Sequence, residues 1–204
     1  MFRSSRIDFK LIFGLILAAG LIFIAFNFTK SFWYMYGAAM LFLLSFGIFN
    51  VNLNKEYSLF KGLIPAVFSA VILYVVFYVG AFVFKFMPFG LNSSVHSAFN
   101  KFATDNWLIW ILMAIAIVPG EEIFWRGFVL KRLLDSYSTW FAVLVATILP
   151  TLMMCFSGNI ALIIGIFVAS LFWNLLYVWR SSLLMLYLSH FLFVFILLAA
   201  LPIY

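Results

Sequence analysis

The chain has 204 residues, of which 68% are hydrophobic and only 9% are charged, and its mean hydropathy is +1.21. This composition excludes a soluble globular protein, indicates an integral membrane protein and leaves no room for a separate soluble domain. The formal net charge of +6 reflects basic loops that set orientation in a membrane, so we expect no nucleic-acid partner. A single cysteine, Cys155, excludes an internal disulfide and a cysteine-based metal cluster.

Seven apolar runs are long enough to cross a bilayer as helices. They cover approximately residues 11–28, 32–51, 60–86, 107–130, 140–156, 160–178 and 183–204. Pro119-Gly120 lies inside the fourth run and is a place where that helix could break. We therefore predict an all-α transmembrane helical bundle of seven to eight segments, formed by one integral membrane domain over residues 1–204.

Basic residues are unevenly divided between the two ends of these runs. With the N-terminus in the cytoplasm, eight lie on that side and three on the other. The cytoplasmic set is Arg3, Arg6, Lys10, Lys55, Lys61, Lys131, Arg132 and Arg180, and the outer set is Lys30, Lys85 and Lys101. The first run lacks a small-x-small cleavage site, so we expect an uncleaved signal-anchor. The pattern predicts a multi-pass protein of a prokaryotic plasma (inner) membrane with a cytoplasmic N-terminus.

Residues 87–106 form the one long polar connection between runs. Such a segment is either an ordinary loop or an amphipathic lid, and we predict a loop. His96 lies in this connection and is expected to face solvent or to play a structural part.

The fourth run contains two adjacent carboxylates, Glu121 and Glu122, in the pattern E-E-x-x-x-R that ends at Arg126. A charge at hydrocarbon depth is costly, so intramembrane carboxylates are usually functional and paired. Glu122 and Arg126 are spaced i,i+4 and can form an ion pair on one helix face. That pair alone could simply join helices, but one arginine compensates only one carboxylate. Glu121, rotated by about 100°, is therefore a candidate general base or acid.

The run E-E-I-F-W-R-G-F from Glu121 to Phe128 resembles the first motif of the CPBP (CAAX-processing and bacteriocin-processing) intramembrane endopeptidases. The resemblance covers roughly the last 90 residues. Residues 107–204 are therefore expected to form a CPBP-like catalytic core, and residues 1–106 a variable set of N-terminal spans and a loop. The resemblance implies catalytic roles for Glu121, Glu122 and Arg126.

The second and third motifs of that family are degenerate here. The second, F-x-x-x-H, falls on residues 150–154, with Met154 where the histidine is expected; we predict that Met154 faces the same cavity as Glu121. The third, H-x-x-x-N or H-x-x-x-D, begins at His190, which is predicted to approach Glu121, and ends at Val194 instead of a polar residue. Asn174 could supply the missing amide in the binding site or could bridge two helices.

A catalytic zinc usually has three protein ligands. The spans offer His190 and two glutamates, one of which Arg126 holds, so we predict neither a metal nor another cofactor. Glutamate-activated water is the simpler mechanism. Cys155 is expected to act as a small hydrophobic residue rather than as a nucleophile.

The resemblance implies an intramembrane protease that cleaves terminal segments of membrane or secreted proteins, such as a leader, a sorting signal or a prenylated C-terminus. Its partners would be a peptide or protein substrate with a membrane-associated segment and the lipid bilayer. Two alternatives remain. The chain could be a catalytically dead relative that binds membrane segments as an immunity or assembly factor. It could also be a small transporter with Glu121 as a proton site, although no repeat symmetry is visible.

Overall fold

The computed structural model describes residues 8–51 and 59–203, and the elements that these residues form are helices. Seven helices are long and apolar enough to cross a membrane. They comprise Phe9–Asn27, Phe32–Asn50, Gly62–Phe84, Trp107–Ser136, Thr139–Ser157, Ile160–Trp179 and Leu183–Ala200. The predicted polytopic α-helical bundle is confirmed, with seven spans in the described part of the chain.

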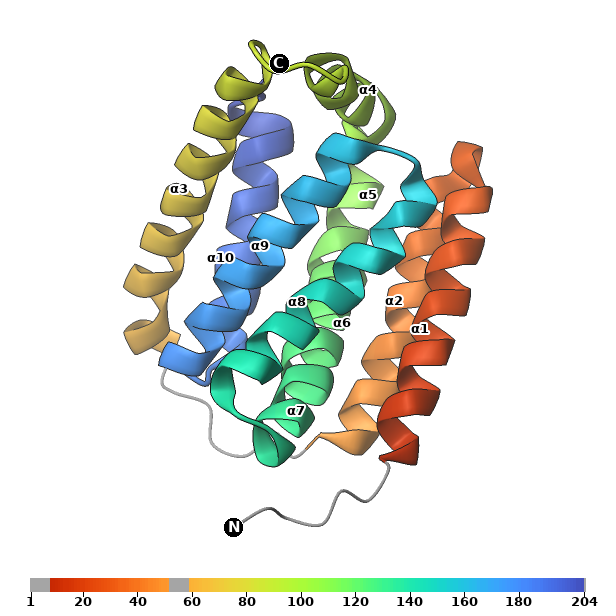
Figure 1. Cartoon of the computed structure of the whole chain (residues 1–204), viewed down its shortest axis with the longest axis vertical. Coiled ribbons are helices and arrows are strands. Elements are labelled where there is room, and N and C mark those ends of the chain that lie inside the picture. The colour runs from red at the N-terminus through yellow and green to blue at the C-terminus, as the bar shows by residue number, and fades with distance from the viewer. Residues whose placement is uncertain (1–7, 52–58, 204) are drawn as a thin grey trace.

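The spans pack side by side, in antiparallel as well as parallel pairs (Figure 1). The elements outside the fourth span are α1 (Phe9–Asn27), η1 (Thr29–Ser31), α2 (Phe32–Asn50), α3 (Leu59–Phe84), α4 (Leu91–Phe102), α8 (Thr139–Met154), η4 (Cys155–Ser157), α9 (Ile160–Trp179), α10 (Leu183–Phe195) and η5 (Ile196–Ala200). Helix α1 packs on α2, α3 packs on α10, and α8 packs on α9. Large apolar side chains cover the outside of the helices, as expected where the surrounding solvent is hydrocarbon.

The fourth span continues through Pro119-Gly120, so the break that the sequence allowed does not occur. Its consecutive pieces are α5 (Trp107–Leu112), η2 (Met113–Ile117), α6 (Val118–Glu121), η3 (Glu122–Leu130) and α7 (Lys131–Ser136). The segments η2 and η3 are π-helical, with i→i+5 hydrogen bonds. A wider helical turn on each side of α6 accommodates the proline without ending the helix, and π-helical segments often mark functional sites. Glu121 and Glu122 lie at the boundary between α6 and η3.

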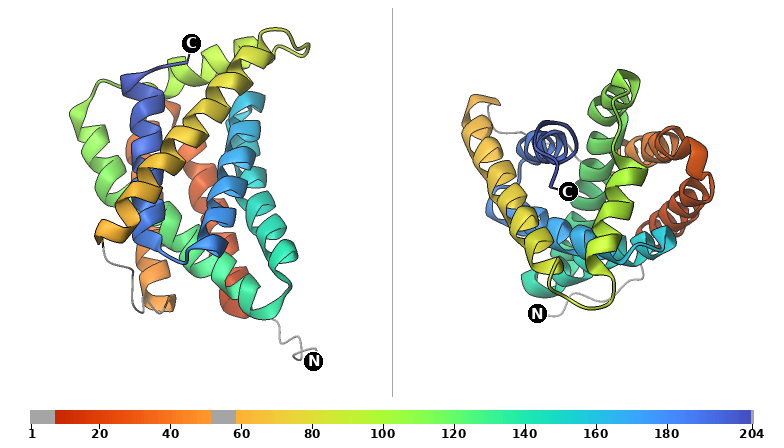
Figure 2. Two further views of the ribbon diagram at one scale, coloured as in Figure 1. Left: turned by 90° about the vertical axis from the view of Figure 1, so that its left-hand side faces the viewer. Right: turned by 90° about the horizontal axis from the view of Figure 1, so that it is seen from above.

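The connection at residues 87–106 contains helix α4, so the prediction of an ordinary loop is wrong. Leu91, Phe99 and Phe102 are buried on one side of α4, whereas His96 is exposed. Hydrogen bonds between Ser94 on α4 and Asn159 just before α9 fix the helix in place. Helix α4 lies across one end of the bundle, as the view from above in Figure 2 shows.

Small residues let α2 approach the fourth span closely. A Cβ atom on Gly120 would lie 2.6 Å from the Met40 carbonyl oxygen, and one on Gly37 would lie 2.5 Å from the Leu112 side chain. Glycine at these positions allows the two backbones to come together, as is common between membrane helices. Helix α2 is therefore placed within reach of Glu121.

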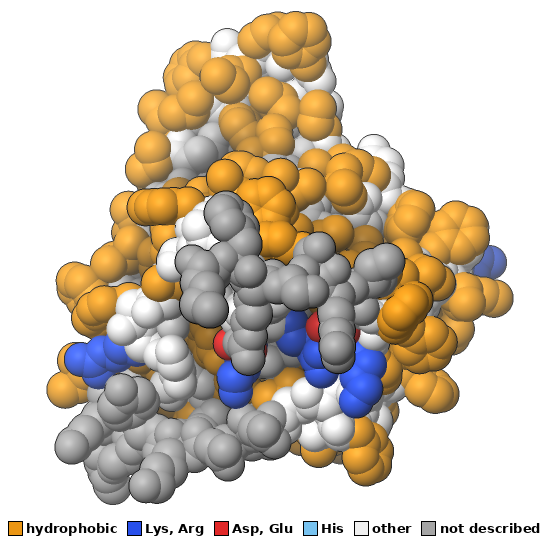
Figure 3. Space-filling model, turned by 60° about the horizontal axis from the view of Figure 1, so that its bottom comes forward, with side chains coloured by type: hydrophobic (Ala, Val, Ile, Leu, Met, Phe, Trp, Pro, Cys, Tyr) orange, Lys and Arg blue, Asp and Glu red, His pale blue; other side chains and the backbone are white. Residues whose placement is uncertain are grey.

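Basic side chains gather at the end of the bundle where α1 begins (Figure 3). Arg132 Nη1 pairs with Asp8 Oδ2 at 2.7 Å and joins α7 to the start of α1. Of the predicted cytoplasmic set, Arg3, Arg6 and Lys55 lie outside the described residues. The gathering of charge agrees with the basis of the orientation prediction, and the orientation itself remains a prediction.

Candidate active site

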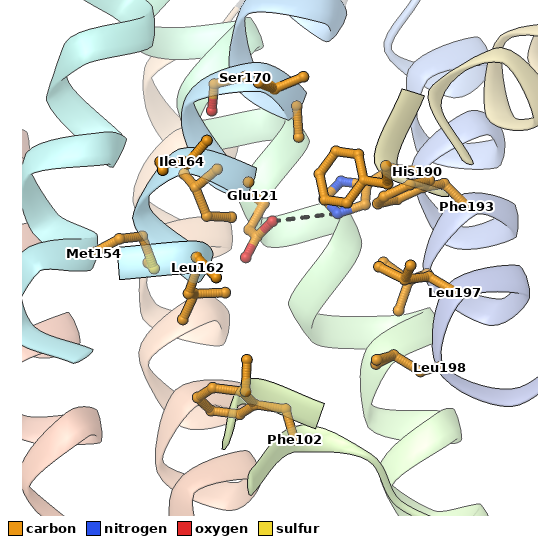
Figure 4. A pocket seen from close by; sticks show the side chains of 18 of the residues that line it. Phe102, Glu121, Met154, Leu162, Ile164, Ser170, His190, Phe193, Leu197 and Leu198 are labelled. Carbon is orange, nitrogen blue, oxygen red and sulfur yellow. Dashed lines mark ion pairs between the residues drawn. The ribbon is translucent and has the colours of Figure 1, made fainter. Parts of the chain in front are cut away.

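A cavity of about 450 Å³ lies inside the bundle, and its wall is mostly aromatic and aliphatic. Residues of α2, α3, α4, α8, α9 and α10 line it together with the fourth span. Glu121 and His190 are among the few polar groups in this wall (Figure 4). Met154 and Val194 also line the cavity, so the prediction that Met154 shares the cavity with Glu121 is confirmed. The positions that carry polar groups in the family motifs here present apolar atoms.

Glu121 and Glu122 are adjacent in sequence but have different surroundings. The Glu121 side chain is 17% exposed, and that of Glu122 is only 1% exposed. Glu121 Oε1 accepts a hydrogen bond from the Tyr36 hydroxyl at 2.5 Å, and its Oε2 lies 3.5 Å from His190 Nε2. Glu121 is therefore the carboxylate that a molecule in the cavity can reach.

His190 connects the two carboxylates across the bundle. Its Nδ1 lies 2.7 Å from Glu122 Oε1, and its Nε2 faces Glu121, which confirms the predicted approach of His190 to Glu121. The imidazole stacks on Trp173 with 3.9 Å between ring centroids, and Ser189 accepts a hydrogen bond from Trp173 Nε1. With Glu122 as acceptor, the Nδ1 position carries a proton and the Nε2 position points to Glu121.

A set of buried hydrogen-bonded side chains begins at Glu122. We call it the inner polar chain, and it consists of Glu122, Arg126, Asn174 and Thr147. Arg126 Nη1 lies 3.2 Å from Glu122 Oε1, which confirms the predicted i,i+4 pair. Arg126 Nε donates to Asn174 Oδ1 at 3.1 Å, and Asn174 Nδ2 donates to Thr147 Oγ1 at 3.0 Å. Asn174 therefore joins η3, α9 and α8 and is not among the cavity-lining residues, as in the helix-bridging alternative.

The charges of the site balance only if one further proton is present. Arg126 offsets one carboxylate, and the second carboxylate is offset when the Glu121–His190 pair holds an extra proton. A buried site without net charge is favoured because isolated charges are costly in a low dielectric. Among the described residues, Glu122 Oε2 is the buried side-chain oxygen that has no hydrogen-bond partner.

Sequence reasoning missed Trp173 and Thr147, and it also missed Tyr36. Tyr36 lies 85 positions before Glu121, in an apolar run with other tyrosine and tryptophan residues, and no local pattern sets it apart. Cys155 is exposed in η4, and its expected role as a small hydrophobic residue rather than a nucleophile stays a prediction. Within the described residues, no group of three or more His, Cys, Asp or Glu side chains is arranged to hold a metal ion.

Residues 103–196 match the family model described as Type II CAAX prenyl endopeptidase Rce1-like. This region is therefore similar to the CPBP family, and the match covers a little less than half of the chain. The match includes the glutamate pair, Arg126, Met154 and His190, so the resemblance drawn from the first motif is confirmed, and α1 to α4 lie outside it. The family match supports intramembrane endopeptidase activity in general. No curated protein and no solved structure matches the chain.

Proposed function

We propose that this protein is an intramembrane endopeptidase in which Glu121 activates a water molecule for attack on a peptide bond. The observation that carries the proposal is the position of the Glu121 carboxylate at the cavity wall, 3.5 Å from His190 Nε2. A base and a potential hydrogen-bond donor that face one cavity are the pair that peptide hydrolysis requires.

In the proposed reaction, Glu121 takes a proton from water while the water oxygen forms a bond to the substrate carbonyl carbon. The carbonyl π electrons move to oxygen, and a protonated His190 donates a hydrogen bond from Nε2 to the resulting oxyanion and keeps its proton. The carbon–nitrogen bond then breaks as the carbonyl re-forms, and Glu121 returns its proton to the leaving amine. The proton that leaves the water ends on the amine, the remaining hydroxyl group ends on the new carboxylic acid, and Glu121 regains its starting state.

The inner polar chain supports this reaction without taking part in it. Glu122, held by Arg126, accepts a hydrogen bond at His190 Nδ1 and so orients the imidazole with Nε2 toward Glu121. Trp173 fixes the plane of the ring by stacking. A histidine oriented through its second nitrogen by a carboxylate is a recurrent arrangement in hydrolases.

The substrates we propose are peptides or proteins with a membrane-associated terminal segment. The cavity is lined mostly by apolar side chains, which suits an apolar residue or a hydrocarbon group near the cleaved bond. A leader, a sorting signal and a prenylated C-terminus all have this chemistry. Mass spectrometry of the protein termini produced by cleavage would separate them.

A second candidate function rests on Met154 and Val194. Both line the cavity and neither can donate or accept a hydrogen bond in the manner of histidine or asparagine. A protein that keeps the cavity but lacks these donors could bind a membrane segment without cutting it, as an immunity or assembly factor.

The decisive experiment is mass spectrometry of membrane-protein termini in cells that carry the wild-type protein or Glu121→Gln. We expect a set of new termini that depends on the wild-type protein and is absent with Glu121→Gln. Asp135→Asn is the matched control because Asp135 is an exposed carboxylate outside the cavity, and it should keep these termini. Identical termini in cells with and without the protein would favour the binding function. Activity lost on chelation and restored by zinc would instead contradict a metal-free reaction.

A further inference from the structure

We propose that Tyr36 is a positioning residue for Glu121: its hydroxyl holds one carboxylate oxygen so that the other stays directed to His190 and the cavity. This inference rests on the proposed role of Glu121 as the base. It extends the site to α2, which lies outside the region matched by the family model.

The two oxygens of Glu121 have separate partners. Oε1 accepts from the Tyr36 hydroxyl, and Oε2 faces His190 Nε2. With one oxygen fixed in this way, the charged carboxylate cannot rotate about the Cγ–Cδ bond without losing its hydrogen bond from Tyr36. Such bonds are roughly twice as strong as neutral ones. The orientation of the base in the cavity is therefore set from α2 as well as from α10.

The Tyr36 ring is itself held in place. It is buried, lines the cavity, and stacks on Phe32 with 5.3 Å between ring centroids and 17° between planes. One turn further along α2, Met40 lies on the same helix face and contacts Gly120, the residue before Glu121. The absence of a side chain at Gly120 brings the backbone of α2 close enough for the hydroxyl to reach Glu121.

A purely structural tie between α2 and the fourth span would use the same hydrogen bond, so the test needs a property of the carboxylate itself. The antisymmetric carboxylate stretch in the infrared spectrum depends on hydrogen bonding. Glu121 is assigned as the band that Glu121→Gln removes from the purified full-length protein. We expect this band to shift in Tyr36→Phe, which keeps the ring and loses only the hydroxyl.

Tyr187→Phe is the matched control, because Tyr187 also loses a hydrogen bond, to the Ala114 carbonyl oxygen, and does not line the cavity. It should leave the Glu121 band in place. In cells, the rate at which the Glu121-dependent termini appear should fall about 10- to 100-fold with Tyr36→Phe, the effect of one hydrogen bond to a charged group. The rate should be near wild type with Tyr187→Phe.

An unshifted Glu121 band in Tyr36→Phe would overturn the inference, because the hydroxyl would then not bind the carboxylate. A shifted band with an unchanged rate would also overturn it and would leave the proposed function intact. If Glu121→Gln itself kept the termini, the proposed function would fail, and the positioning role of Tyr36 would fail with it. The Glu121→Gln variant therefore distinguishes a failure of the proposed function from a failure of the positioning role alone.

Discussion

Glu122 and the three side chains behind it are hydrogen-bonded in the inner polar chain, whereas in front of Glu121 the cavity wall is mostly apolar. The two carboxylates that meet at this boundary are consecutive residues of one helix. One is sealed between Arg126 and His190, and the other reaches the cavity with Tyr36 and His190 as its polar neighbours.

This contrast shows how one helix can use neighbouring carboxylates for different purposes. Successive residues point about 100° apart on a helix, so one can face a packed interior and the next a cavity. The buried carboxylate then contributes order, because removing its partner leaves an uncompensated charge. In the proposed function, the reachable carboxylate contributes chemistry, because a substrate can approach it. Variants on the two sides of the site should therefore differ in which property they lose, stability or activity.

The largest difference is expected between Arg126→Ala and Glu121→Gln. Arg126→Ala leaves Glu122 buried without its cation, which should lower the free energy of unfolding by about 3–5 kcal/mol. Glu121→Gln should keep nearly the full stability and lose activity by about 10²–10⁴-fold. Thermal unfolding in detergent measures the first effect, and the appearance of new termini measures the second.

Arg132→Ala is the matched control for Arg126→Ala, since it breaks an ion pair that is partly exposed. Its cost should be below about 1 kcal/mol. Equal loss of stability in Arg126→Ala and Glu121→Gln would show that the two sides of the site are not separate.

The next effect concerns the apolar side of the cavity. Met154→His places a hydrogen-bond donor in the wall that Glu121 faces, and one such donor is typically worth about 10²–10³ in rate. We expect faster appearance of the Glu121-dependent termini, or their first appearance if the parent protein is inactive. Met153→His is the control, because Met153 is buried outside the cavity. A cavity-lining histidine that cleaves nothing would strengthen the binding function.

The parts of the site that the sequence predicted are local or carried by a motif. The spacing of four between Glu122 and Arg126 is a property of one helix, so their pairing could be derived directly. His190 lies 68 positions from Glu122, and only the family resemblance brought it to the site. Tyr36 has neither kind of signal, because the contact depends on how closely α2 packs on Gly120. Long-range packing of this kind cannot be derived from helical periodicity.

The fold shows the same limit. The seven spans follow from apolar run length alone, and their ends were predicted within a few residues except that the fourth continues past residue 130 to Ser136. Helix α4 was missed because its many polar residues outweighed the apolar positions Leu91, Val95, Phe99 and Phe102, which recur every three or four residues. The continuity of the fourth span through Pro119 could not be predicted either, since it depends on neighbouring π-helical turns.

The smallest effect is expected at Asp8, on the basic end of the bundle, where it pairs with Arg132. Burial alone would raise the pKa of Asp8, but hydrogen bonds from the Leu11 amide and the Arg132 guanidinium, with the charge of Arg132, hold it below its usual value. A carboxylate with a lowered pKa in the folded state adds stability above its unfolded pKa of about 3.9. That contribution disappears as the pH falls below this value and through the folded pKa.

Asp8→Asn keeps an N-cap acceptor for Leu11 and removes the charge, whereas Asp8→Ala removes both. Because the Asp8 side chain is 36% exposed and solvent screens the pair, Asp8→Asn should cost less than about 1 kcal/mol at pH 7. Asp8→Ala should cost about 1 kcal/mol more. Thermal midpoints of the three proteins should show that the difference between wild type and Asp8→Asn vanishes on acidification and shrinks in high salt. The additional cost of the missing cap in Asp8→Ala should persist under both conditions. A difference that survives at low pH would mean that the charge of Asp8 is not what joins α1 to α7.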